Sequence, residues 1–336
     1  MLSINFISEF DNSAASFRSR ILRLYKYVSS IMTHVELNGV NNSYDIVVIQ
    51  KASTRFIYKQ FLKYKKRHTF IIFDIDDYCD NKYKFFIKHA DLVVVGSSFL
   101  KEKWQYLNEN IVVLDDPVDI NDLNIPLKKQ LSLKRCKLGW FGNITNLDIL
   151  HSTNVSDVKT ITRGGDIEWS PDTIDKNIQK FDLILLPQDI HSNYGAAKGN
   201  CRMLKSLYLG VPVLCSDLAA YVDLAELLDY PREMIMHDGE DWNKRIQDIK
   251  DGVIAPKFDF KKYRELILAN YSFETRGQQW LDIVTKYYNH RHCHFIKNVL
   301  FWLHGFPFLK IRNGNNRTII ILGFIKINYK KRTKNG

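Results

Sequence analysis

Short β-branched runs alternate with helical segments along this chain, and this alternation constrains its fold more than any other feature. In the first part of the chain, the runs apolar enough for strands are residues 4–7, 44–50, 70–74, 90–96 and 111–114. The segments between them with the spacing of amphipathic helices are residues 13–30, 54–65 and 98–108. This order predicts a parallel, doubly wound sheet that is buried on both faces.

The same pattern then occurs a second time. Residues 121–131 are polar and contain Pro126, so we expect a linker there. Further strands are expected at residues 136–143, 157–162, 181–187 and 212–215, and helices at 200–209, 241–250, 260–270 and 274–288. We therefore expect an α/β protein with two Rossmann-like domains, over residues 1–125 and 132–272, and a C-terminal helix over 273–290. Such sheets bind ligands beyond the carboxyl ends of their strands.

The net charge of +11 is distributed unevenly along the chain. Residues 291–336 hold ten Lys or Arg and no acid, which leaves about +1 for residues 1–290. Residues 51–67 also contain seven Lys or Arg and no acid. Such stretches suit anionic lipid headgroups or nucleic acid. We expect no nucleic acid partner, because the cations of the tail lie beside apolar residues and not in a recognition module.

The tail over residues 291–336 twice combines apolar residues with a lysine, at 303–311 and at 322–327. This combination predicts an amphipathic segment that associates with an anionic membrane surface. The alternatives are a β-hairpin packed on the body of the protein for the tail and a merely solvated helix face for residues 54–65. The residues expected at the membrane are Arg55, Lys59, Lys63, Phe306, Phe308, Lys310, Arg312 and Lys326.

The sequence also predicts where the protein resides. No apolar run approaches the roughly 18 residues of a spanning helix, the richest being 319–325. The first residues lack the basic start and apolar stretch of a secretion signal, and the five cysteines form no CxxC pair. We therefore expect a cytoplasmic protein that is peripheral on the inner face of a membrane.

Two cations mark the start of the helix expected over residues 200–209. Lys198 and Arg202 follow the strand that ends at Pro187 and precede the turn at Gly210. The free N–H groups and the dipole of a helix N-terminus attract anions, so two cations there suit a nucleotide diphosphate. The alternative is that Arg202 caps a neighbouring helix or pairs with a carboxylate.

The segment from Lys198 through Arg202 to the Gly-Val-Pro-Val turn at 210–213 resembles the donor site of GT-B glycosyltransferases of the family-4 kind. A bacterial subgroup that builds polysaccharides such as lipopolysaccharide or capsule is the most similar. The other matching stretches are residues 15–20, 74–77, 138–143, 169–187 and 219–221. Together they cover most of residues 1–290. The resemblance implies a nucleotide-sugar donor held mainly by the second domain and a glycan or lipid-linked oligosaccharide acceptor held by the first.

The resemblance also assigns residues to these two ligands. The donor residues are Gly142, Asn143, Lys198, Arg202 and Lys205, and the acceptor or phosphate residues are Ser16, Arg18, Arg20 and Asp77. Surface ion pairs are the alternative for Arg18 and Arg20. No catalytic base can be named from the motifs. Enzymes of this fold generally need no metal, so we expect no cofactor, and Asp74, Asp76 and Asp77 are not expected to bind one.

Lys205 departs from the resemblance, because the family usually has a Glu there that contacts the donor ribose or sugar. The function that the sequence supports is a hexosyltransferase that extends a bacterial surface glycan, with donor identity and activity left open by Lys205. The alternatives are a catalytically silent GT-B fold that acts as a binding or scaffold protein, and a GT-B sugar-nucleotide epimerase.

Overall fold

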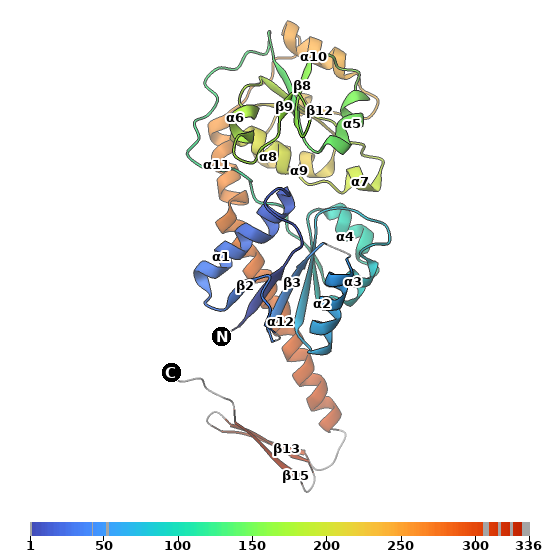
Figure 1. Cartoon of the computed structure of the whole chain (residues 1–336), viewed down its shortest axis with the longest axis vertical. Coiled ribbons are helices and arrows are strands. Elements are labelled where there is room, and N and C mark those ends of the chain that lie inside the picture. Colours follow the sequence, from blue (N-terminus) through green and yellow to red (C-terminus); the bar gives the residue numbers. More distant parts are fainter. Residues whose placement is uncertain are drawn as a thin grey trace. The chain divides into compact units, whose positions relative to one another are not determined.

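The computed structural model describes residues 2–41, 43–51, 54–304, 309–314, 317–322 and 325–330 (Figure 1). Beyond residue 291 it describes the backbone alone. The chain divides into two compact units, Met1–Leu281 and Asp282–Gly336. The first unit contains two parallel sheets of six strands each, which confirms the predicted fold class.

The first sheet has the order β2-β1-β3-β4-β5-β6, and all its neighbouring strands are parallel. Its strands are β1 (Ile4–Ile7), β2 (Val35–Leu37), β3 (Ile46–Gln50), β4 (Phe70–Ile75), β5 (Leu92–Val95) and β6 (Ile111–Val113). β2 was not predicted, because three residues are too few to show a strand pattern. β1, β3, β4 and β5 are buried throughout, as their apolar runs predicted.

Helices cover both faces of this sheet (Figure 1). One face carries the π-helix η1 (Phe17–Leu22) and α1 (Arg23–Ile31), which divide the single helix expected over 13–30. The other carries α2 (Arg55–Lys66), α3 (Lys84–His89) and α4 (Ser98–Trp104), whose apolar side chains share a core with β3, β4 and β5. Thr54 and Ser97 cap α2 and α4 with their hydroxyls, as residues at helix N-caps commonly do.

The second sheet has the order β12-β11-β10-β7-β8-β9, again with parallel neighbours. Its strands are β7 (Leu138–Phe141), β8 (Val158–Thr162), β9 (Ile167–Glu168), β10 (Leu183–Leu186), β11 (Val213–Ser216) and β12 (Ile235–Met236). Gly139 is needed in β7, because a Cβ there would collide with the buried ring of Phe181. A side chain at this position would therefore separate β7 from the segment that leads into β10.

The connections of the second sheet are mostly short helices. They are η2 (Ile144–Asn146), α5 (Leu147–His151), α6 (Ile174–Ile178), α7 (Asn193–Ala196), α8 (Cys201–Tyr208), α9 (Ala219–Leu228), η3 (Arg232–Met234), α10 (Trp242–Asp251) and α11 (Phe260–Tyr271). Six of the eight residues of α8 are buried, so this helix is part of the core and its first turn is fixed in place. The long connection over residues 114–137 contains neither helix nor strand.

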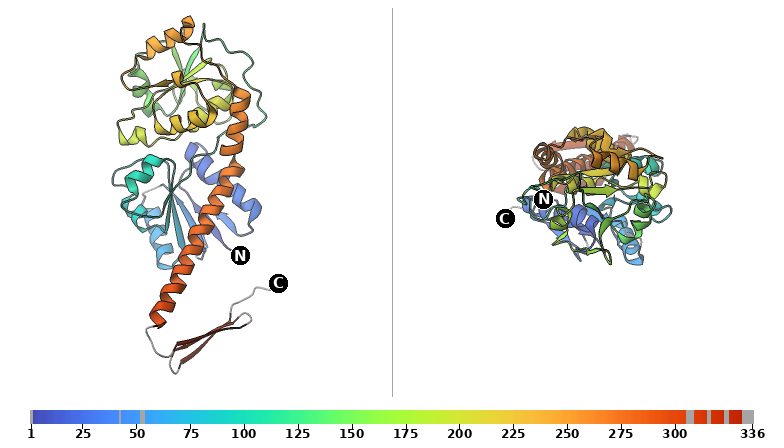
Figure 2. Two further views of the ribbon diagram at one scale, coloured as in Figure 1. Left: turned by 180° about the vertical axis from the view of Figure 1, so that it is seen from behind. Right: turned by 90° about the horizontal axis from the view of Figure 1, so that it is seen from above.

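The last helix, α12 (Phe273–His304), is longer than the helix expected over 273–290. No Gly or Pro interrupts the sequence between Gly277 and Gly305, which explains the extra turns. Its beginning lies on the α1 face of the first sheet, where Trp280 packs against Phe6 at 5.6 Å between ring centroids (Figure 2). Residues beyond Leu281 belong to the second unit.

In the second unit, β13 (Leu309–Gly314), β14 (Arg317–Leu322) and β15 (Ile325–Lys330) form an antiparallel sheet. The sequence predicted an amphipathic, membrane-associating tail here, with a hairpin packed on the body of the protein as the alternative, and both stay predictions. Whether this sheet meets a membrane stays a prediction. No helix in the part of the chain that the structure describes combines the length and hydrophobicity that crossing a membrane requires.

Candidate functional site

Residues 96–97, directly after β5, meet residues 197–198, which lie between α7 and α8 in the connection that follows β10. Ser97 donates its hydroxyl to the carbonyl oxygen of Ala197 at 3.0 Å, and Ala197 is buried in the core of the first domain. The next residue, Lys198, pairs with Asp77 of the first domain, with 2.7 Å between Nζ and Oδ1. Because parallel sheets bind ligands beyond the carboxyl ends of their strands, this meeting point is the candidate site.

Gly142 and Arg202 come together at the carboxyl end of β7. Arg202 Nη1 donates to the carbonyl oxygen of Phe141 at 3.2 Å, and a Cβ built on Gly142 would meet the ring of Trp140 at 2.9 Å and the same nitrogen at 3.3 Å. Asn143 shapes this turn, because its side-chain oxygen accepts the N–H of Thr145 at 3.2 Å. Arg202 is the second residue of α8, where the helix dipole favours anions. Donor binding by these residues stays a prediction.

Asp77 contacts lysines from both domains. Its carboxylate pairs with Lys198 and with Lys51, and Lys51 also lies 2.7 Å from Asp76. Burial alone would raise the pKa of Asp77, but the charges of Lys51 and Lys198 outweigh it and lower the pKa to about 2. Burial likewise opposes the charged form of Lys51, and Asp76 and Asp77 outweigh it and raise the pKa of this lysine. Asp77 and Lys51 are therefore charged near neutral pH.

Arg20 is engaged by carboxylates inside the first domain. Its guanidinium makes two hydrogen bonds to Asp74, at 2.7 and 2.9 Å, and others to Asp116 and to the carbonyl oxygen of Leu114. Only 4% of the side chains of Arg20 and Asp74 is exposed. The geometry agrees with the ion-pair alternative for Arg20, although this pair is buried, and gives no support to a role in acceptor binding.

Lys205 also points into the protein. Its Nζ lies 2.7 Å from Asp175 and 4.0 Å from Asp119, and 8% of its side chain is exposed. Asp175 also accepts the backbone N–H of Asn121 at 2.9 Å. Lys205 therefore ties the connection between the domains to α6 and α8, and a contact of its amine with a donor stays a prediction without geometric support.

Arg18, in the first domain, contacts the cluster formed by Lys205, Asp119 and Asp175. Its Nη2 lies 3.0 Å from Asp119, and its guanidinium lies 5.4 Å from the ring centre of Trp169 in the second domain. Burial opposes the ionisation of Asp119, but Lys205, Arg18 and Arg23 outweigh it and lower the pKa of this carboxyl. Ser16 stands at the start of η1 without a side-chain cap bond. The four predicted acceptor residues are thus spread over different clusters.

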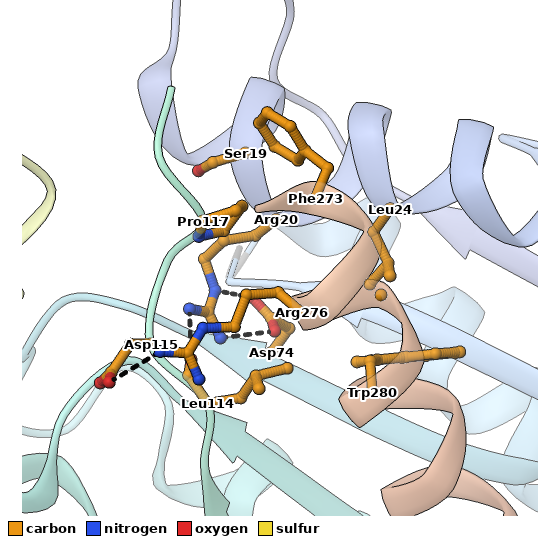
Figure 3. A pocket seen from close by; sticks show the side chains of 11 residues that line it. Ser19, Arg20, Leu24, Asp74, Leu114, Asp115, Pro117, Phe273, Arg276 and Trp280 are labelled. Atoms are coloured by element: carbon orange, nitrogen blue, oxygen red, sulfur yellow. Dashed lines mark hydrogen bonds and ion pairs between the residues drawn. The ribbon is translucent and has the colours of Figure 1, made fainter. Parts of the chain in front are cut away.

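A pocket in the first domain lies on the α12 side of Arg20 (Figure 3). It is lined by Arg20, Asp74, Asp115, Arg276 and Trp280, together with apolar residues and Ser19, and by none of the predicted donor residues. Arg276 Nε and the indole N–H of Trp280 have no acceptor among the described residues. Ordered water is the expected partner for such groups. Of the predicted site residues, this pocket holds the acceptor candidate Arg20 and none of the donor candidates.

The membrane residues predicted in the first domain lie on α2. Arg55 and Lys59 are exposed and Lys63 is half-buried, beside the exposed aromatic rings of Phe56 and Tyr58. Among the tail residues, Lys310 and Arg312 lie on β13 and Lys326 on β15. Phe306 and Phe308 fall outside the described residues.

Several residues at the meeting point and in the Lys205 cluster were not predicted as site residues. Lys51 was assigned only to a basic run, and Asp119 and Asp175 were not singled out. The position of Lys51 directly after an apolar strand was an available signal, because strand ends line the site in such folds. Among the described residues, no three His, Cys, Asp or Glu side chains are placed to hold a metal ion. Asp74, Asp76 and Asp77 each face a cation instead.

No protein-family model and no curated protein sequence matches the chain. Solved structures do match. HepE of Anabaena in complex with UDP is 9% identical with a TM-score of 0.56, over 85% of this chain and 100% of that one. Sucrose-phosphate synthase of Thermosynechococcus elongatus is 11% identical with a TM-score of 0.58, over 86% and 100%. A glycosyltransferase of Rickettsia africae is 11% identical with a TM-score of 0.56, over 85% and 98%. Like these structures, the chain has the GT-B fold of two Rossmann-like domains.

Proposed function

We propose that the chain is a glycosyltransferase that moves a sugar from a nucleotide-sugar donor to a glycan acceptor. The observation that carries this proposal is the pairing of Gly142 and Arg202 at the carboxyl end of β7. A guanidinium at a helix N-terminus binds a phosphate by charged hydrogen bonds. In the reaction, Arg202 and Lys198 would stabilise the charge that develops on the leaving diphosphate.

The similar structures favour a donor class. HepE has been crystallised with UDP and with UDP-glucose, so uridine nucleotides are the first candidates. On the resemblance of the sequence, the acceptor is a growing, lipid-linked bacterial surface glycan and the transferred sugar a hexose. Donor binding is proposed to need no metal ion, because the cations Lys198 and Arg202 supply the positive charge.

A thermal-shift screen against UDP, GDP, CMP, dTDP and their common sugars tests this proposal. We expect one nucleotide family to raise the melting temperature, because a ligand that binds only the folded state stabilises it by mass action. At about 100 times its Kd, the stabilisation is about 2.7 kcal/mol. A melting temperature unchanged by every nucleotide would contradict the proposal and favour a catalytically silent GT-B fold.

We also propose that α2 meets an anionic membrane surface, which would bring the site to a lipid-linked acceptor. The exposed face of α2 combines Arg55 and Lys59 with Phe56 and Tyr58, which are 53% and 42% exposed. Tyr58 packs against Phe85 of α3 at 4.9 Å between centroids, so the two helices form one surface. Aromatic rings among cations are typical of helices that lie at a membrane interface.

The double substitution Lys59→Glu and Lys63→Glu tests this surface. We expect it to weaken binding to vesicles with anionic lipid by about 10-fold or more, since each cation near the surface contributes about 1 kcal/mol. Co-sedimentation with vesicles measures the effect. The matched control is Lys244→Glu with Lys257→Glu, two exposed lysines of the second domain that give the same change in net charge. Equal losses in both variants would contradict a role for α2.

A further inference from the structure

The contact between Asp77, Lys51 and Lys198 is held in place by the surrounding backbone. Asp77 and Lys51 come from loops that follow β4 and β3, and Lys198 from the loop before α8. Their side chains are 30%, 9% and 19% exposed, so the charges are partly shielded from water. The adjacent hydrogen bond from Ser97 to Ala197 fixes the backbone beside Lys198 against the first domain. The three groups therefore meet because the backbone holds them together.

The carboxylate of Asp77 stands where a phosphate oxygen would also be bound. It lies between two ammonium groups, one from each domain, and both are ligands that phosphate groups use. Lys198 Nζ also lies 3.6 Å from the ring centre of Tyr194, which gives the ammonium a second favourable contact. A phosphate that approaches Lys198 meets the negative charge of Asp77, and two like charges at one site repel each other.

Resting on the proposed function, we infer that Asp77 competes with the diphosphate of the donor for Lys198 and Lys51. Asp77 is then an internal anion that lowers affinity for phosphate-bearing ligands. Lys51 becomes a further cation of the donor site, supplied by the first domain. The competition concerns the phosphate groups only, so a nucleoside without phosphate is bound with the same affinity whether or not Asp77 is charged. This opposes the expectation, drawn from the resemblance, that Asp77 itself contributes to phosphate binding.

Asp77→Asn tests the inference, because it removes the charge and keeps the shape of the side chain. We expect the Kd for the nucleoside diphosphate that stabilises the wild type to fall by about 3- to 10-fold, the size of a partly screened ion pair. The Kd for the corresponding nucleoside is expected to stay unchanged. The matched control is Asp80→Asn, an exposed acid in the same loop that accepts a hydrogen bond from Tyr78. This control is expected to bind both ligands as the wild type does.

A double substitution separates competition from an indirect effect. In a Lys198→Gln background, Asp77→Asn is expected to lose the part of its gain that comes from Lys198 and to keep the part that comes from Lys51, which still pairs with Asp77. Weaker or unchanged diphosphate binding in Asp77→Asn, with the fold intact, would overturn the inference while leaving the proposed function in place. Diphosphate binding absent from both the wild type and Asp77→Asn would instead overturn both.

Discussion

Arg20→Met is expected to destabilise the first domain by about 3–5 kcal/mol, the usual cost of removing one partner of a buried ion pair. Arg20 is the cation shared by Asp74 and Asp116, at 2.7 and 2.8 Å. Without it, two carboxylates at the ends of β4 and β6 face each other with little access to water. Thermal unfolding measures the loss, which corresponds to a melting temperature lower by about 6–20 °C for a domain of this size.

The pH dependence of this loss identifies its cause. Burial raises the pKa of Asp74 even beside Arg20, and the pKa of Asp116 is raised by burial as well. Removing Arg20 raises both further above their unfolded values. A carboxyl whose pKa is higher in the folded than in the unfolded protein adds to the free energy of unfolding when it is protonated. This contribution is complete below the unfolded pKa, near 3.8, and is lost as pH rises through the folded pKa. The difference in free energy of unfolding between the wild type and Arg20→Met should therefore become smaller as pH falls from 7 to 5.

The control for Arg20 is Arg23→Met in the following helix. Arg23 pairs with Asp119 at 3.0 Å, and 23% of its side chain is exposed, so its removal is expected to cost less. A loss in Arg20→Met that is no larger than in Arg23→Met, or that does not change with pH, would contradict the buried ion-pair account.

Lys205→Glu is expected to destabilise the second domain by more than about 3–5 kcal/mol, because it reverses a buried charge and does not merely remove it. Lys205 lies 2.7 Å from Asp175 and 4.0 Å from Asp119, with 8% of its side chain exposed. The substitution would place three carboxylates in one buried cluster. Denaturant unfolding followed by circular dichroism measures the loss.

Two further variants define the cause of the Lys205→Glu effect. Lys205→Met is expected to lower the free energy of unfolding by less. In this variant Asp175 keeps its hydrogen bond from the N–H of Asn121, and Asp119 keeps its ion pairs with Arg18 and Arg23. Adding Asp175→Asn to Lys205→Glu should restore part of the stability, since one of the three acids is then neutral. A stable Lys205→Glu that binds nucleotide more tightly than the wild type would contradict this account and place the side chain in the donor site.

Most of the fold could be predicted from the sequence, because the spacing of apolar residues indicates the strands and helices. Strands buried on both faces, such as β3 and β10, appear as continuous apolar runs that no loop resembles. β2 and β9, of three and two residues, are too short to leave such a signal. The division of residues 13–30 into a π-helix and an α-helix also has no periodic signature, because both place apolar side chains at similar intervals.

The site was predictable only in part, because charge partners are set by tertiary contacts. Arg202 and Gly142 lie close together, and their positions at a helix start and a strand end could be read from the sequence. The direction of a long charged side chain does not follow from its position, and Lys205 and Arg20 turn towards buried carboxylates far away in sequence. Lys51 was assigned to a basic stretch and not to the site, although it follows β3 directly. Ion-pair partners such as Asp175 and Asp119 become visible only when the chain is folded.

Equilibrium titration of the stabilising nucleoside diphosphate into the wild type and Arg202→Ala tests the central claim most directly. The control is Arg232→Ala, an exposed arginine that precedes β12 at the opposite end of the sheet. The account predicts that Arg202→Ala weakens binding by about 10- to 160-fold, the loss of a charged hydrogen bond, and that Arg232→Ala binds as the wild type does. Wild-type affinity in a folded Arg202→Ala would contradict the account and remove α8 from the nucleotide site.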